Sequence, residues 1–140
     1  MTTDLSTVRP RTASLAYIDA VNEGRLDRLP DLVTGEVVDH HLPPELPAGV
    51  EGLRVWVDML RTALQLHIQV NDVVDAGDRV AVRGRITGTH VGDFAGMPAT
   101  GRSFDAAYMS FERVVDGRIA ERWEVADTAT ITTQLMAAGK

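Results

Sequence analysis

Four segments of alternating apolar and polar residues fill the second half of the sequence, and they constrain the fold more than any other feature. The segments cover residues 66–75, 79–90, 104–115 and 118–127. A period of two residues is typical of strands that bury one face. A short turn separates the first two segments and another separates the last two, where Asp116-Gly117 is a strong hairpin signal. The pattern therefore predicts an antiparallel meander of four strands.

The first half of the sequence predicts helices. Residues 13–22, 25–33 and 51–64 carry apolar side chains at helical spacing. Gly24 suits the end of the first helix, and Pro30 limits the second to a turn or two. A short extended run at residues 36–42 precedes two prolines. Helices followed by strands predict an α+β domain in which a curved antiparallel sheet wraps around the helices.

The composition limits both the number of domains and the class of partner. With 140 residues, 44% of them hydrophobic, we expect a single domain over residues 1–140, with a polar tail at residues 1–11. A formal net charge of -6 argues against a nucleic acid or an anionic membrane as partner. The chain has no cysteine, which excludes a disulfide framework and a cysteine nucleophile.

The sequence contains no apolar run long enough for a signal peptide or for a membrane span of about 18 residues. We therefore expect a cytoplasmic protein.

Asp127 is the first candidate site residue. Strict alternation along residues 118–127 places it on one face with Ile119, Trp123 and Val125. A carboxylate beside apolar surface loses hydration, which shifts its pKa toward the range where it can both take and give a proton. The alternative is that Asp127 caps a helix predicted for residues 128–135.

Histidines supply the next candidates. His40 and His41 are neighbours in an extended run and point to opposite sides, so only one can enter a pocket, and we expect it to be His40. The alternative is a hydrogen-bonded histidine at the edge of the core. His90 ends the inward-facing row of the strand at residues 79–90. A metal site built from His40 and His90 would lack a third ligand at a recognisable spacing, so we expect no metal.

Residues 91–103, VGDFAGMPATGRS, form a loop with three glycines and a proline. A loop of this length can form a wall or a lid over the mouth of a cavity. It lacks the GxxxxGK[ST] pattern of a phosphate-binding loop.

The motifs GTHVGDF, GMPATGR and DGRIAERWEVAD, in this order and spacing, resemble those of the SnoaL-like polyketide cyclase family, which has the nuclear-transport-factor-2-like fold. The resemblance covers residues 13–135. It implies a cone-shaped α+β barrel with an apolar pocket, and ring closure of polyketides by aldol condensation without a metal or organic cofactor. It also implies an aspartate as general acid/base, which matches Asp127 by its place in WxxxD, and a homodimer or homotetramer formed through the sheet face.

Together, the residues and the resemblance predict a cofactor-free enzyme that acts on an apolar, carbonyl-bearing, polyketide-like small molecule. Asp127 would move the proton, while His40, His90 or Tyr17 would donate hydrogen bonds to carbonyl oxygens. The predicted substrate-binding side chains are those of Tyr17, Trp56, Phe94, Met97 and Trp123.

Three other functions fit the same residues. The ketosteroid isomerases resemble this fold and place their base on the early strand near His40, so a proton-transfer isomerase is one alternative. A binding protein without catalysis is the second, and a dimeric interaction scaffold that uses the outer face of the sheet is the third.

Overall fold

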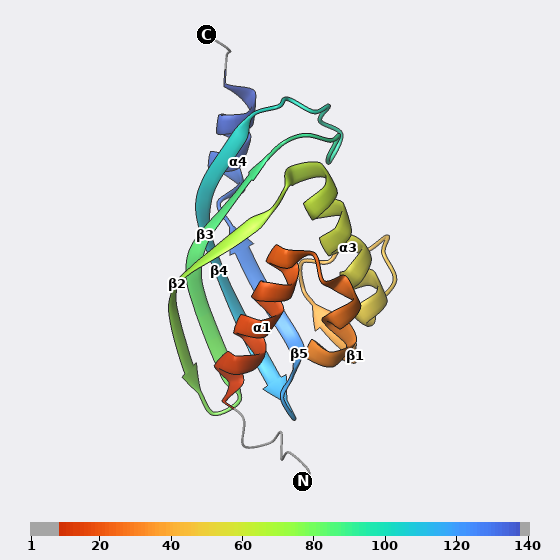
Figure 1. Cartoon of the computed structure of the whole chain (residues 1–140), viewed down its shortest axis with the longest axis vertical. Coiled ribbons are helices and arrows are strands. Elements are labelled where there is room, and N and C mark those ends of the chain that lie inside the picture. The colour runs from red at the N-terminus through yellow and green to blue at the C-terminus, as the bar shows by residue number, and fades with distance from the viewer. Residues whose placement is uncertain (1–8, 138–140) are drawn as a thin grey trace.

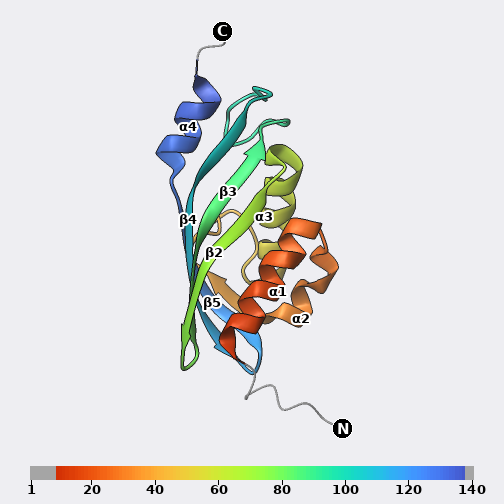
Figure 2. The same cartoon turned by 60° about the vertical axis from the view of Figure 1, so that its left-hand side comes forward.

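A curved five-stranded sheet with most of its helices on one face forms the body of the molecule (Figures 1 and 2). The computed structural model describes residues 9–137. The helical elements are α1 (Pro10–Glu23), η2 (Leu26–Arg28), α2 (Leu29–Leu32), α3 (Gly49–Leu64) and α4 (Thr128–Met136). The strands are β1 (Val33–Asp39), β2 (His67–Ala76), β3 (Arg79–Thr89), β4 (Ser103–Val115) and β5 (Arg118–Ala126).

The predicted α+β class and the meander are confirmed. Strands β2, β3, β4 and β5 are antiparallel neighbours in the order of the chain. Strand β1 pairs with β5 in parallel, so the sheet is mixed rather than wholly antiparallel, and its order is β1-β5-β4-β3-β2. Because β1 and β2 remain edges, the sheet curves without closing into a barrel (Figure 2).

The Asp116-Gly117 hairpin joins β4 to β5 as predicted. Both turn residues have left-handed backbones, with φ of 50° at Asp116 and 78° at Gly117. This is the geometry of a two-residue turn whose twist matches that of the flanking strands. It places Val115 opposite Arg118 and so determines where the pairing of β4 and β5 starts.

The main core lies between α1, α3 and the inner face of the sheet. Tyr17, Leu29, Leu53, Val80 and Ile119 are almost completely buried there. A second, smaller apolar cluster lies beyond it, where α4 meets the ends of α3 and β4. In Figure 2 α4 extends past the other helices, beside the far end of the sheet. Apolar side chains thus cover the inner face of the sheet in two clusters.

A β-bulge in β5 changes which side chains face inward. Arg113 pairs with Glu121, but the next residue of β4, Val114, pairs with Ile119, so Ala120 is an extra residue. One extra residue reverses the alternation of every residue that follows it. Ile119 and Arg122 therefore both face the interior, which strict alternation forbids.

The predicted helices are present with small changes at their ends. Pro10 and Arg11, expected in the tail, belong to α1, while residues 1–8 of that expected tail lie outside the described residues. Gly24 ends α1 with φ of 74°, as predicted. Within residues 9–137 no helix is both long and apolar enough to span a membrane.

Candidate functional site

A pocket of about 620 Å³ lies between the inner face of the sheet, α3 and α4. Its volume falls within the range of about 300–1,000 Å³ that is typical of small-molecule sites. Most of its wall is apolar, including Leu60, Leu64, Ile86, Phe104, Ile131 and Leu135. The polar lining side chains are those of His41, His90, Tyr108, Glu124, Thr128 and Thr132.

Four of the predicted site residues line this pocket. Trp56 of α3 and Phe94 of the loop form part of the wall, with ring centroids 5.7 Å apart. Phe94 and Met97 are joined by two backbone hydrogen bonds, which fold the tip of the loop over the pocket. His90 is buried in the wall. The loop thus forms a wall of the pocket, as the sequence predicted.

Asp127 lies elsewhere, and the environment predicted for it is wrong. Its carboxylate is exposed and caps α4 by accepting hydrogen bonds from the backbone N–H and the hydroxyl of Thr130, at 3.1 and 2.6 Å. The bond from the Thr130 hydroxyl, followed by that from the N–H, lowers the pKa of Asp127 instead of raising it. Asp127 faces outward because the bulge at Ala120 precedes it.

The expectation that His40 faces the pocket is also wrong, and His41 lines it instead. The His40 ring lies on the outer face of the sheet, stacked on Trp123 at 4.7 Å, with Nε2 2.7 Å from a Glu121 carboxylate oxygen. Trp123, predicted to bind substrate, is therefore outside the pocket as well. The inner face of β1 is the one that carries Asp39, whose carboxylate is bound in the interior.

Tyr17 lies in the core and is not among the residues that line the pocket. It is 2% exposed, and the Arg122 guanidinium sits 4.8 Å from its ring centroid. Burial raises its pKa above the ordinary value, so its hydroxyl stays protonated. Tyr17 therefore packs against the Arg122 guanidinium, and it does not contact the space that a substrate would occupy.

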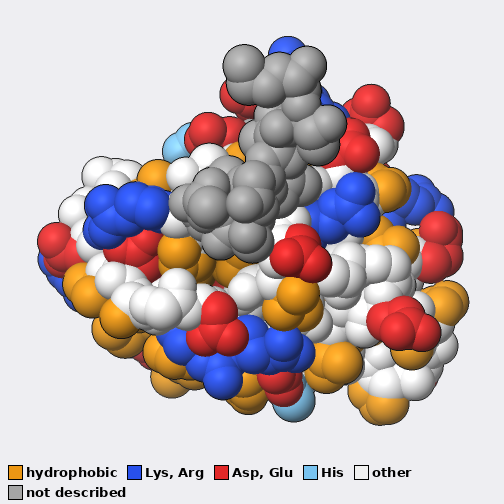
Figure 3. Space-filling view, turned by 90° about the horizontal axis from the view of Figure 1, so that it is seen from below, with side chains coloured by type: hydrophobic (Ala, Val, Ile, Leu, Met, Phe, Trp, Pro, Cys, Tyr) orange, Lys and Arg blue, Asp and Glu red, His pale blue; other side chains and the backbone are white. Residues whose placement is uncertain are grey.

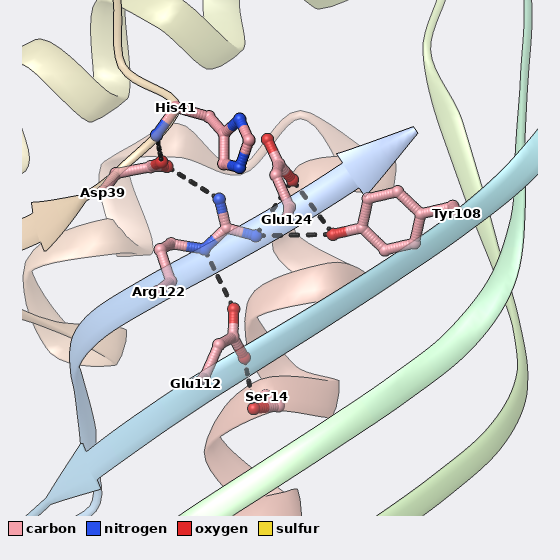
Figure 4. Close-up of polar contacts among 7 residues, drawn as sticks. All are labelled: Ser14, Asp39, His41, Tyr108, Glu112, Arg122 and Glu124. Carbon is pink, nitrogen blue, oxygen red and sulfur yellow. Dashed lines mark hydrogen bonds and ion pairs between the residues drawn. The ribbon is translucent and has the colours of Figure 1, made fainter. Parts of the chain in front are cut away.

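Glu124 is the carboxylate that faces the pocket. Its Oε2 atom accepts hydrogen bonds from the Tyr108 hydroxyl at 3.1 Å and from Nη2 of Arg122 at 3.2 Å. Burial, followed by the Glu124 charge, raises the pKa of Tyr108 well above its usual range, so Tyr108 remains a donor. Figure 4 shows the rings of His41 and Tyr108 on either side of the carboxylate. Because both bonds go to Oε2, Oε1 is the oxygen left to meet a ligand.

Arg122 connects this carboxylate to a fully buried group of charges (Figure 4). Its Nη1 donates to Asp39 at 2.7 Å, and its Nε donates to Glu112 at 2.9 Å. The hydroxyl of Ser14 in α1 donates to the other oxygen of Glu112. The side chains of Asp39, Glu112 and Arg122 are each no more than 2% exposed. One guanidinium therefore holds three carboxylates, and only that of Glu124 reaches the pocket.

Residues 9–137 contain no group of three or more histidine, aspartate or glutamate side chains arranged to hold a metal ion.

At the end of the molecule where the N-terminus lies, acidic and basic side chains are interspersed with apolar ones rather than gathered into a patch of one sign (Figure 3).

The profile of the SnoaL-like polyketide cyclase family matches residues 11–135. The chain belongs to this family. Aklanonic acid methyl ester cyclase DnrD of Streptomyces peucetius is 31% identical over 111 residues, which cover 74% of each chain. The corresponding cyclase DauD of Streptomyces sp. strain C5 is equally similar over 74% of this chain and 67% of its own.

Solved structures support the same membership. Wild-type IdmH of Streptomyces antibioticus superposes with a TM-score of 0.79 at 32% identity, covering 91% of this chain and 99% of IdmH. TsrD of Streptomyces laurentii superposes with a TM-score of 0.82 at 25% identity, covering 99% and 100% of the two chains. These similarities support a polyketide-cyclase-like function for this member of the SnoaL-like family.

Sequence reasoning missed three polar residues of the pocket, namely His41, Tyr108 and Glu124. Tyr108 could have been found, because it lies on the inward row of β4 that begins at Phe104. Glu124 could not be found by alternation, since the bulge that turns it inward has no marker in the sequence: Ala120 is neither glycine nor proline.

Proposed function

We propose that this SnoaL-like protein is a cyclase that closes a ring in an apolar, carbonyl-bearing, polyketide-like molecule by proton transfer, with Glu124 as the general acid/base. The observation that carries the proposal is a single carboxylate that faces an apolar pocket while Tyr108 and Arg122 hold its other oxygen. This arrangement supports Glu124 rather than Asp127 for the role predicted from the sequence. The similarity to the cyclases DnrD and DauD supports the reaction class.

The chemistry requires a base in contact with an acidic C–H group. A carbon between two carbonyls is acidic enough for a positioned carboxylate to remove its proton. The enolate carbon then attacks a second carbonyl of the same molecule, and Glu124 returns the proton to the new alkoxide. The pocket wall would hold the chain folded, so that an internal collision becomes an oriented one. His41, beside Glu124, would donate a hydrogen bond to the developing oxyanion.

Replacing Glu124 with glutamine tests the proposal, since the amide keeps the shape but cannot accept the proton. With aklanonic acid methyl ester as substrate, we expect turnover to fall about 10²- to 10⁴-fold, the usual contribution of general acid/base catalysis. Ring closure by aldol addition moves a hydrogen without loss of atoms, so the product is detected as a new chromatographic peak of unchanged mass.

The matched control is Asp127→Asn, which keeps the helix cap because asparagine caps as well as aspartate does. We expect its turnover to stay close to that of the unmodified protein. A large loss of turnover in Asp127→Asn together with full turnover in Glu124→Gln would instead assign the proton transfer to Asp127. An unmodified protein that forms no product would contradict the proposed substrate class.

We also propose that the chain forms a homo-oligomer through the outer face of the sheet. Met109, Phe111 and Val125 lie exposed on this face, next to Trp123. Neighbouring exposed apolar side chains of this kind are typical of a protein interface.

A further inference from the structure

The imidazole of His90 is held in one orientation by the loop that follows it. The backbone N–H of Thr100 donates to His90 Nδ1 at 3.3 Å, and the Thr100 hydroxyl lies 3.2 Å from the same atom. The hydroxyl oxygen in turn accepts from the N–H of Arg102 at 3.2 Å. Because Nδ1 accepts from a backbone N–H, the neutral ring carries its proton on Nε2.

The Nε2 atom of His90 is buried and has no hydrogen-bond partner among the residues that the structure describes. His90 is 1% exposed and lines the pocket, and its Nδ1 edge is turned toward Thr100. The free edge of the ring is therefore the one that carries the Nε2 proton. A buried donor without an acceptor is unfavourable and rare in folded proteins, so its partner is expected to come from outside the chain.

His90 and Glu124 lie far apart along the sheet. Backbone hydrogen bonds place His90 level with Arg102, just before β4, whereas Glu124 pairs with Ser110 in β4. Eight residues of strand separate these two levels, about 26 Å along the backbone at about 3.3 Å per residue. Apolar side chains, including Ile86 and Phe104, line the pocket alongside them. The two polar groups thus belong to different ends of the pocket.

We infer that His90 is a ligand-binding residue whose Nε2–H donates to an acceptor oxygen of the ligand, at the end of the pocket remote from Glu124. Thr100 is its positioning residue, because it fixes the proton on Nε2. This inference rests on the proposed function in one respect only, namely that the reacting carbon of the ligand lies at the Glu124 end of the pocket. The ligand class it defines is an elongated apolar molecule with a carbonyl or phenolic oxygen far from the carbon that loses its proton.

The test compares two probes of nearly equal shape, 2-acetylnaphthalene and 2-isopropenylnaphthalene, which differ by a carbonyl oxygen in place of a methylene group. We expect the unmodified protein to bind the ketone about tenfold more tightly, the usual effect of one hydrogen bond to a buried donor. His90→Leu should abolish this preference. His90→Gln should keep part of it, since glutamine offers an N–H near the Nε2 position. His40→Leu, a change at a histidine outside the pocket, should leave it intact.

Nitrogen NMR of the histidine side chains gives a second measurement, which decides the matter if His90→Leu fails to fold. In the unmodified protein we expect the Nε2–H tautomer for His90, and a shift of its Nε2 resonance on adding the ketone but not the hydrocarbon. The inference is overturned by the Nδ1–H tautomer, by equal or absent binding of the two probes, or by a ketone preference that survives His90→Leu. Binding needs no turnover, so failure of the Glu124 proposal would leave this result unchanged.

Discussion

The buried guanidinium of Arg122 determines where the Glu124 carboxylate points. Among residues 9–137 it is the only cation in contact with Asp39 and Glu112, and its remaining Nη2 atom reaches Glu124. A guanidinium offers several donors in one plane, so its bonds to two buried carboxylates fix the direction of the donor left for the third. The orientation of the proposed base is therefore set by ion pairs on the core side of the sheet.

Replacing Arg122 with methionine should strongly destabilise the fold. The change leaves Asp39 and Glu112 buried without a cation, and breaking a buried ion pair in this way costs about 3–5 kcal/mol. Urea denaturation followed by circular dichroism measures the free energy of unfolding.

The control for that prediction is Arg83→Met. Arg83 pairs with Asp72 on the surface, where both side chains are 58% exposed, so its loss should cost about 0–1 kcal/mol. Equal effects of the two substitutions would contradict the role assigned to Arg122.

Among the elements, the sequence predicted the helices and the meander, but neither the bounds and pairing of β1, expected at residues 36–42, nor the phase of β5. The meander, the Asp-Gly hairpin and α3 follow from periodicity and turn chemistry, which are local properties. The phase of β5 depends on how its pairing with β4 slips at Ala120, and a slip of one residue changes no local propensity. This is why the wall residues Trp56, Phe94 and Met97 were found, whereas Glu124 was assigned to the wrong face.

The choice between His40 and His41 failed for a related reason. Alternation along β1 was predicted well, but it does not say which row is buried. The inner row contains Asp39, a charged residue that is buried only because Arg122 reaches it from β5. A contact between residues 83 positions apart cannot be inferred from the composition of one strand.

Strands β2 and β3 lie very close together at Gly84, and we expect this position not to tolerate a side chain. A Cβ atom there would collide with the backbone carbonyl of Gln69, next to the bulge in β2. Gly84→Ala should therefore lower the free energy of unfolding by about 1–3 kcal/mol, as overpacking does. Gly35→Ala in β1 is the control, since a Cβ there meets no atom within 4 Å. Thermal unfolding measures the stability of both variants. Equal stability of Gly84→Ala and Gly35→Ala would contradict the prediction.

The start of α1 is attached to β2 through Asp75, and this contact should depend on pH. Hydrogen bonds from Arg11, with a further one from Arg9, hold the pKa of Asp75 well below its usual range. A depressed pKa adds stability above the unfolded value of about 3.9, and this stability is lost as the pH falls below it. Asp75→Asn should thus be less stable than the unmodified protein at pH 7, with the difference narrowing toward about pH 3.

Denaturation curves at several pH values measure this difference. Asp72→Asn, at an exposed ion pair, should cost less at pH 7. If the difference in the free energy of unfolding between Asp75→Asn and the unmodified protein stayed constant with pH, Arg11 would not be binding the carboxyl charge.

In the whole molecule, the two faces of the sheet have different roles. The inner face carries the core, the buried charges and the pocket, all covered by α1, α3 and α4. In Figure 2, α1, α2 and α3 all lie on the inner side of the sheet, and α4 lies beside its upper end. Met109, Phe111 and Val125 are 56%, 44% and 65% exposed on the outer face. Trp123 lies among them, with its ring centroid 5.9 Å from that of Phe111. A second copy of the chain could cover this patch symmetrically, as in an isologous dimer.

Phe111→Lys should therefore convert the proposed oligomer into monomers, because it places a charge without a partner in the centre of an apolar interface. Sedimentation velocity of the full chain measures the change in mass. Met59→Lys is the matched control: Met59 has the same 44% exposure but lies on α3, away from the outer face of the sheet. If the unmodified protein were already a monomer, or if both variants dissociated alike, the outer face would not be the interface. Met109, Phe111 and Trp123 are not among the residues that line the pocket, so a monomeric Phe111→Lys variant should still bind ligand.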